Sequence, residues 1–147
     1  MDRHARQTAP SGAAPPEPTE IAGGFVRVVL ALVIIELTAA TATIHFDLGG
    51  PLFTLDGFGY VALAAAYAIG ALAPIAIVQR FAWLPRLGLA GYALVTIGAY
   101  VVVGSYFALG WITKGIELAI VGLLVADMLI VYGSPRKVWR AVLGTSR

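Results

Sequence analysis

The hydrophobic pattern of this 147-residue chain has four long apolar stretches, at about 25–44, 57–78, 87–109 and 112–132. A helix needs roughly 20 apolar residues to cross the hydrocarbon layer of a bilayer. None of the stretches shows the short two-residue alternation of a membrane barrel strand. The pattern therefore predicts an all-α, polytopic integral membrane protein, an antiparallel bundle of four transmembrane helices.

Composition supports a membrane environment. Hydrophobic residues make up 59% of the chain, charged residues only 12%, and the mean hydropathy is +0.86. In soluble domains about a quarter of the residues are charged. The absence of Cys excludes disulfides and thiolate metal sites. A net charge of +2 gives no reason to expect a nucleic-acid partner. We expect the lipid bilayer as the main partner and no cofactor.

Three regions follow from these stretches. Residues 1–22, rich in Pro, Ala, Ser and Thr, are expected to form a disordered cytoplasmic tail. The first apolar stretch begins too late and is too long for a cleaved signal peptide. Residues 23–133 form the predicted transmembrane domain. Residues 134–147 are basic, and Ser134 followed by Pro135 is typical of a helix start. This segment is either a short helix on the inner leaflet or a frayed basic tail.

The orientation of the protein in the membrane follows from its basic residues, because short loops that carry Lys and Arg stay on the cytoplasmic side. With four crossings, nearly all of them fall on one side and only Lys114 falls on the other. We therefore expect a multi-pass protein of the cell membrane with both termini cytoplasmic and outer loops at 45–56 and 110–113. Trp83, Trp111 and Trp139 lie at predicted span ends, where an aromatic belt is expected.

Small residues recur at helical spacing in the spans and predict close helix packing. We expect this packing to be mainly within one chain, although the same residues are also typical of dimer interfaces. The second, third and fourth spans provide Gly59, Ala62, Ala66, Gly70, Ala73, Gly91, Gly98, Gly115, Ala119, Gly122 and Ala126. Pro74 is expected to bend the second span.

Glu36 lies near the middle of the first predicted span, too deep for its short side chain to reach water. An unpaired charge at this depth costs a few kcal/mol or more, so the neutral acid is favoured. Two interpretations remain open. Glu36 relays a proton or cation, or it is a neutral acid bonded to a neighbouring helix through Tyr100, Tyr67 or Thr96.

Two further pairs are predicted near the membrane boundaries. Asp127 and Arg27 are expected to form an ion pair on the cytoplasmic side if their helices are neighbours, with a transport role for Asp127 as the alternative. Lys114 and Glu117 are three positions apart and therefore share a helical face near the outer boundary. A local ion pair between them explains how an acid enters the membrane.

The predicted outer loop contains His45, Asp47 and Asp56, and we expect Asp56 to cap the second span. Together with Glu117, these side chains are candidates for a cluster on the outer face. No recognised metal-ligand spacing connects them, so no metal site is expected. His45 is predicted to be a hydrogen-bonding residue at the interface.

The segments 44–46, 50–59, 106–107 and 112–117 resemble small four-span membrane proteins of the actinobacterial type. These proteins often have a His at the end of the first span and a Gly-Pro-Leu-Phe turn before the second. In gross layout the chain is also similar to the DoxX-like proteins. The resemblance covers the membrane portion and implies a four-span topology without an activity.

The sequence contains no nucleophile elbow, no paired-His motif and no phosphate-binding loop, so an enzyme is not expected. The leading hypothesis is a non-catalytic scaffold or accessory subunit of a membrane complex, partnered by a second copy or another subunit. The alternative is a small proton-coupled transporter or ion-conducting protein that uses Glu36, with Asp127 on the inner side and Glu117 and Lys114 on the outer side. A membrane enzyme using His45 and Asp47 ranks below both.

Overall fold

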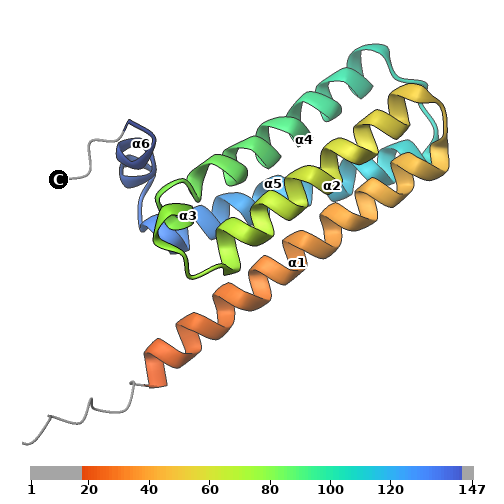
Figure 1. Ribbon diagram of the computed structural model, residues 1–147. Helices are drawn as coiled ribbons and strands as arrows, with labels where there is room; N and C mark the ends of the chain where they lie inside the picture. Colours follow the sequence, from red (N-terminus) through yellow and green to blue (C-terminus); the bar gives the residue numbers. More distant parts are fainter. Residues whose placement is uncertain (1–17, 144–147) are drawn as a thin grey trace, which may run out of the picture.

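The computed structural model describes residues 18–143, without the side chains of 18–21 and 141. This part of the chain contains six helices and no strand. They are α1 (Pro18–Leu48), α2 (Pro51–Leu72), α3 (Ala76–Arg80), α4 (Trp83–Val103), α5 (Ala108–Tyr132) and α6 (Pro135–Leu143). The long helices α1, α2, α4 and α5 lie alongside one another in an antiparallel bundle, and each is long and apolar enough to cross a membrane (Figure 1). The predicted all-α four-helix fold is confirmed.

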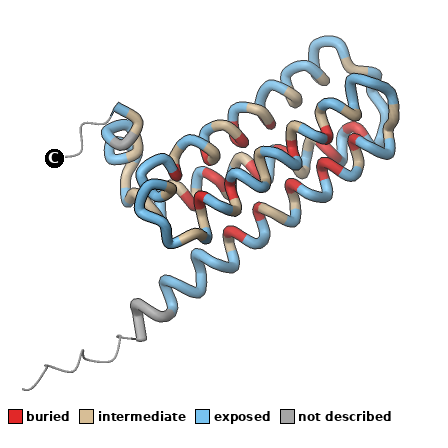
Figure 2. Tube along the Cα trace, viewed as in Figure 1, coloured by how far each residue is buried: buried red, intermediate tan, exposed pale blue. Residues whose placement is uncertain are grey.

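The four long helices form a closed ring of neighbours. Helix α1 packs against α2 and α5, and α4 packs against the same two helices on the other side. The α1–α2 and α4–α5 connections lie at one end of the bundle, here named the distal end, and α3 and α6 lie at the other, the α3 end (Figure 1). The N-terminal part of α1 projects beyond the bundle at the α3 end, and residues 22–29 are exposed (Figure 2).

The distal connection between α1 and α2 is far shorter than the predicted loop at 45–56. Only Gly49 and Gly50 separate the helices, with φ of 69° and 82°, a conformation that glycine adopts without strain. Pro51 occupies the first helical position of α2, where its missing N–H costs nothing. His45 therefore belongs to α1 and Asp56 to α2, so the predicted capping role of Asp56 is wrong.

The second and third spans were predicted too late along the chain at both ends, whereas the predicted end of the fourth span at 132 agrees with the end of α5. Pro74 does not bend a continuous span, because α2 already ends at Leu72. The Gln79 side chain donates hydrogen bonds to the carbonyls of Gly70 (3.3 Å) and Ala73 (2.8 Å), which the end of the helix leaves free. The second distal connection lies at 104–107 and not at 110–113.

Residues 1–17 of the predicted tail at 1–22 lie outside the described residues. Residues 18–22 belong to α1. The helix start at Pro135 agrees with the prediction. The backbone N–H of Lys137 donates to the Ser134 hydroxyl at 3.4 Å, so Ser134 acts as the expected cap.

The core lies between the four long helices (Figure 2). Its buried apolar residues are Ala31, Ile34, Ala42, Tyr60, Tyr67, Leu89, Ala90, Ala93, Ile120 and Leu124. Glycines of α2 make the close approaches expected of them, since a side chain at Gly59 would overlap Tyr92.

Four glycines of α4 and α5 differ from those of α2. A Cβ added at Gly91, Gly98, Gly115 or Gly122 would meet no atom within 4 Å. These positions are exposed and face away from the core. The expectation that they pack within one chain is therefore wrong, and the outward surface of both helices remains available for contact with lipid or another helix.

Candidate functional site

Six polar side chains gather inside the distal end of the bundle and are here named the distal cluster. They come from all four long helices: His45, Asp56, Tyr60, Thr96, Lys114 and Glu117. His45 is 3% exposed and Glu117 is fully buried. Buried charged groups of this kind persist only when they are paired and hydrogen-bonded.

His45 has oxygen atoms close to both nitrogens of its ring. Its Nδ1 lies 2.7 Å from the Thr41 carbonyl oxygen, and because a carbonyl only accepts, Nδ1 carries a hydrogen. Its Nε2 lies 2.9 Å from Asp56 Oδ2 and 3.8 Å from Glu117 Oε1. The 2.9 Å contact requires a proton between His45 and Asp56, either on the ring or on the carboxyl group.

Glu117 is held by neighbours on α4 and α5. Lys114 Nζ lies 2.7 Å from each carboxylate oxygen, which agrees with the ion pair predicted from the sequence spacing. The Thr96 hydroxyl donates to Glu117 Oε2 at 2.9 Å. The Tyr60 hydroxyl lies 2.8 Å from Thr96 Oγ1 and completes the chain of contacts. The buried acid is thus compensated by one cation and one hydroxyl donor.

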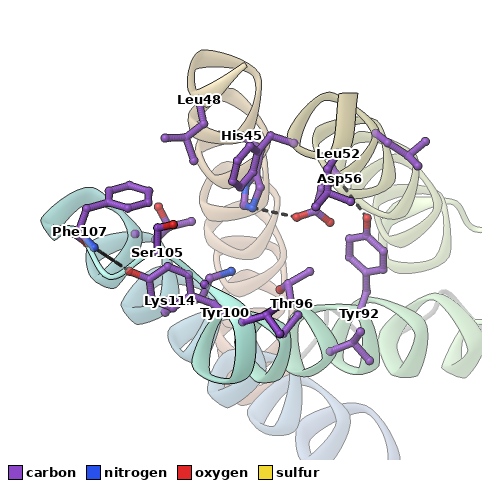
Figure 3. Close-up of a pocket in the computed structure, with 18 residues that line it drawn as sticks. His45, Leu48, Leu52, Asp56, Tyr92, Thr96, Tyr100, Ser105, Phe107 and Lys114 are labelled. Carbon is purple, nitrogen blue, oxygen red and sulfur yellow. Dashed lines mark hydrogen bonds and ion pairs between the residues drawn. The ribbon is translucent and has the colours of Figure 1, made fainter. Parts of the chain in front are cut away.

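A cavity of about 620 Å³ opens beside the distal cluster (Figure 3). His45, Asp56, Thr96 and Lys114 contribute polar groups to its lining, which is otherwise mostly apolar. Figure 3 shows Tyr92, Tyr100 and Phe107 placed around this space. The cavity therefore joins buried charge to an apolar, aromatic surface, as small-molecule sites do.

A second polar cluster lies toward the α3 end. Arg86 Nε donates to Asp127 Oδ2 at 2.7 Å, and the Tyr67 hydroxyl donates to the same oxygen at 3.2 Å. The Arg86 guanidinium also lies 5.5 Å from the centre of the Tyr67 ring. Both members of the ion pair are almost completely buried.

The predicted partner of Asp127 is therefore wrong. Arg27 is exposed and forms no ion pair with Asp127, although both line a smaller cavity of about 300 Å³. Arg86 was missed because the third span was predicted to start at residue 87, which placed Arg86 in a loop. Trp83, an expected interface residue, is the first residue of α4 and marked the correct boundary.

Glu36 faces away from the bundle. Its side chain is exposed, and it forms no hydrogen bond or ion pair with any residue in 18–143. Its predicted contacts are wrong, because Tyr67 bonds Asp127 and Thr96 bonds Glu117, while Tyr100 bonds Phe107.

The remaining loop candidates separate in the structure. His45 and Asp56 meet, with Glu117 beside them, whereas Asp47 is exposed at the end of α1 and does not line the cavity. Within 18–143, no three His, Asp or Glu side chains are grouped so that they could hold a metal ion. Tyr60 and Thr96 were not predicted members of the cluster, since only the folded bundle brings them to Glu117.

No protein-family model, curated protein or solved structure matches this chain.

Proposed function

We propose that this small membrane protein is a non-catalytic accessory subunit or scaffold that binds another transmembrane helix through the outward face of α1. The observation that carries the proposal is the position of Glu36, an acid at mid-span with no polar partner in the described bundle. Polar side chains within hydrocarbon are costly alone and promote helix association when they find a partner.

The depth of Glu36 supports this function. The span Ala22–Leu48 contains 27 residues, so Glu36 is about 20 Å from each end at the helical rise. A carboxyl group on a short side chain does not reach the lipid headgroups from there. A hydrogen-bonding group on a neighbouring helix at the same depth removes this cost.

The surface around Glu36 has the composition of a helix interface. Phe25, Val29 and Leu32 precede Glu36 on the side of α1 that faces away from the bundle, and all are exposed. Ala40 and Thr43 follow on the same side and are small enough for close backbone approach. Gly115 and Gly122 of α5, which are open, provide a second outward surface of the same kind.

Cross-linking in native membranes tests this function directly, because the chain contains no Cys. A single cysteine at Ala40, A40C, is expected to form one defined disulfide product on mild oxidation if the partner is a second copy. With another subunit, a bifunctional cross-linker is expected to give one defined heteromeric product. V61C, on the exposed side of α2, is the matched control and should give none.

The dependence on Glu36 separates a specific interface from random collision. E36L is expected to abolish the A40C product, whereas E36Q, which still forms hydrogen bonds in lipid, is expected to keep it. Equal products from A40C and V61C, or an unchanged yield in E36L, would contradict the proposal.

A second candidate function is a proton-coupled transporter or ion-conducting protein that uses Glu36. Its support is the mid-span depth of the acid, which is shared with the first candidate. Glu36 does not line either of the two cavities described above. In proteoliposomes, E36Q is expected to abolish proton or cation flux if this function holds, and unchanged flux would remove it.

We also infer a cell-membrane location with the α3 end on the cytoplasmic side. The support is the position of the basic residues, since Arg80, Arg136 and Lys137 lie at the α3 end and Lys114 toward the distal end. A cysteine at Asp47 should then react with a membrane-impermeant reagent in intact cells, and one at Ser134 only after lysis. The reverse pattern would invert the orientation.

A further inference from the structure

We propose that the distal cavity binds a monovalent organic cation, an amine or quaternary ammonium with an apolar group, in exchange for the proton shared by His45 and Asp56. The proposal is independent of helix association at Glu36. It rests on the charges of the distal cluster and on the chemistry of the cavity beside it.

The first step is the charge balance. With one proton shared between His45 and Asp56, the two acids of the cluster are balanced by that proton and by Lys114. The buried group is then neutral as a whole, which is the state that a low-dielectric interior favours. Loss of the proton leaves one net negative charge beside the cavity. A cation entering the cavity restores neutrality, so cation binding and proton loss are linked.

The second step is access. The Asp56 side chain is 19% exposed, whereas His45 is 3% exposed and Glu117 is fully buried. Asp56 also lines the cavity directly. A positive group in the cavity therefore meets Asp56 first and displaces the proton from the contact between Asp56 and His45.

The third step is the wall chemistry. Tyr92, Tyr100 and Phe107 line the cavity (Figure 3). Aromatic rings attract cations, quaternary ammonium groups among them, and Lys114 Nζ already lies 5.7 Å from the centre of the Tyr100 ring. Leu48, Leu52 and Val95 provide apolar surface for the rest of a ligand. A volume of about 620 Å³ lies in the usual range of small-molecule pockets. This wall favours an organic cation over a hydrated inorganic ion.

Charged and titratable groups face His45 and Asp56 from each helix that lines the cluster. They are Tyr60 on α2, Tyr92 and Tyr100 on α4, and Lys114 and Glu117 on α5. An anionic ligand is disfavoured, because Lys114 is already bound by both Glu117 oxygens at 2.7 Å. Without the shared proton the cluster would repel an anion.

The test uses the full-length protein in mild detergent, with benzyltrimethylammonium as the probe and isothermal titration calorimetry as the measurement. Binding is expected to tighten as the pH rises, by up to about tenfold per pH unit, the linkage for one proton released per cation. Titrations in two buffers of different ionisation enthalpy should show that release. Binding without proton release, or no binding, would overturn the proposal.

Three variants locate the site. D56N keeps the shape and removes the charge, so at least about a tenfold loss of cation affinity is expected. D47N, which removes an equal charge from the same end outside the cavity, should bind like the unaltered protein. H45Q should bind the cation with a much smaller pH dependence. An effect of D47N equal to that of D56N would overturn the assignment.

Phenylacetate is the anionic counterpart of the probe. Phenylacetate binding in place of benzyltrimethylammonium would overturn the proposed charge of the ligand. Size-exclusion profiles check the fold of each variant, and the proton-release measurement on the unaltered protein keeps the proposal falsifiable if D56N does not fold.

Discussion

Arg86 on α4 and Asp127 on α5 form an ion pair at 2.7 Å inside the bundle, with side chains only 2% and 3% exposed. The pair joins two helices that are consecutive among the long helices, and Tyr67 of α2 completes it from a third. Such a pair contributes little beyond an apolar replacement, but loss of one member leaves a buried charge without a partner.

Replacing Arg86 alone is therefore expected to be costly. R86L should lower the free energy of unfolding by about 3–5 kcal/mol, because Asp127 is left buried and unpaired. R27L, which changes the exposed residue predicted from the sequence, should change it by less than about 0.5 kcal/mol. Denaturation in mild detergent, followed by circular dichroism, measures both. The double variant R86L/D127L should recover much of the loss, and no recovery would contradict this account.

Gly59 of α2 and Gly122 of α5 predict opposite effects of an added methyl group on stability. In G59A the new Cβ overlaps Tyr92, so a destabilisation of about 1–3 kcal/mol is expected. In G122A the new methyl group meets open space, and the gain in helix propensity should leave stability unchanged or raise it by up to about 1 kcal/mol. Thermal unfolding of the two variants side by side gives the comparison. Equal destabilisation would show that α5 is packed on that face.

At the distal end, the stability of the fold is expected to depend on the ion pair between Lys114 and Glu117. K114M leaves the fully buried Glu117 with Thr96 as its remaining donor, and a loss of about 3–5 kcal/mol is expected. K137M, on the exposed part of α6, is the matched control and should be near neutral. Adding E117Q to K114M should restore part of the stability. An additive loss in the double variant would argue against direct coupling.

Helix α6 predicts contact with an anionic surface. Val138, Trp139 and Val142 share one side of the helix, while Arg136 and Lys137 lie on the other, and Trp139 is 64% exposed. A short helix of this kind lies in the interface of anionic lipid. With W83F and W111F as background, Trp139 fluorescence should shift to the blue when anionic lipid replaces zwitterionic lipid around the protein. R136E/K137E should remove the shift, and a shift that persists in that variant would contradict the prediction.

Several features of the protein are determined by local sequence alone. The four spans follow from apolar stretches of sufficient length, because a backbone in lipid must satisfy its own hydrogen bonds. The Lys114–Glu117 pair follows from a spacing of three on one helix. Ser134 and Pro135 predict the start of α6 because capping depends on neighbouring residues. Boundaries were predicted less well, because the polar residues His45, Asp47 and Asp56 lie inside helices and were assigned to a loop.

Only the tertiary structure decided which side of each helix faces the core. In a soluble protein an apolar stripe marks that side, but in lipid both the core side and the outer side of a helix are apolar. The sequence therefore could not show that Asp127 pairs with Arg86 and not Arg27, that Glu36 faces outward, or that Gly115 and Gly122 are open. The meeting of His45 with Asp56 likewise depends on how α1 and α2 are rotated against each other, which no local pattern encodes.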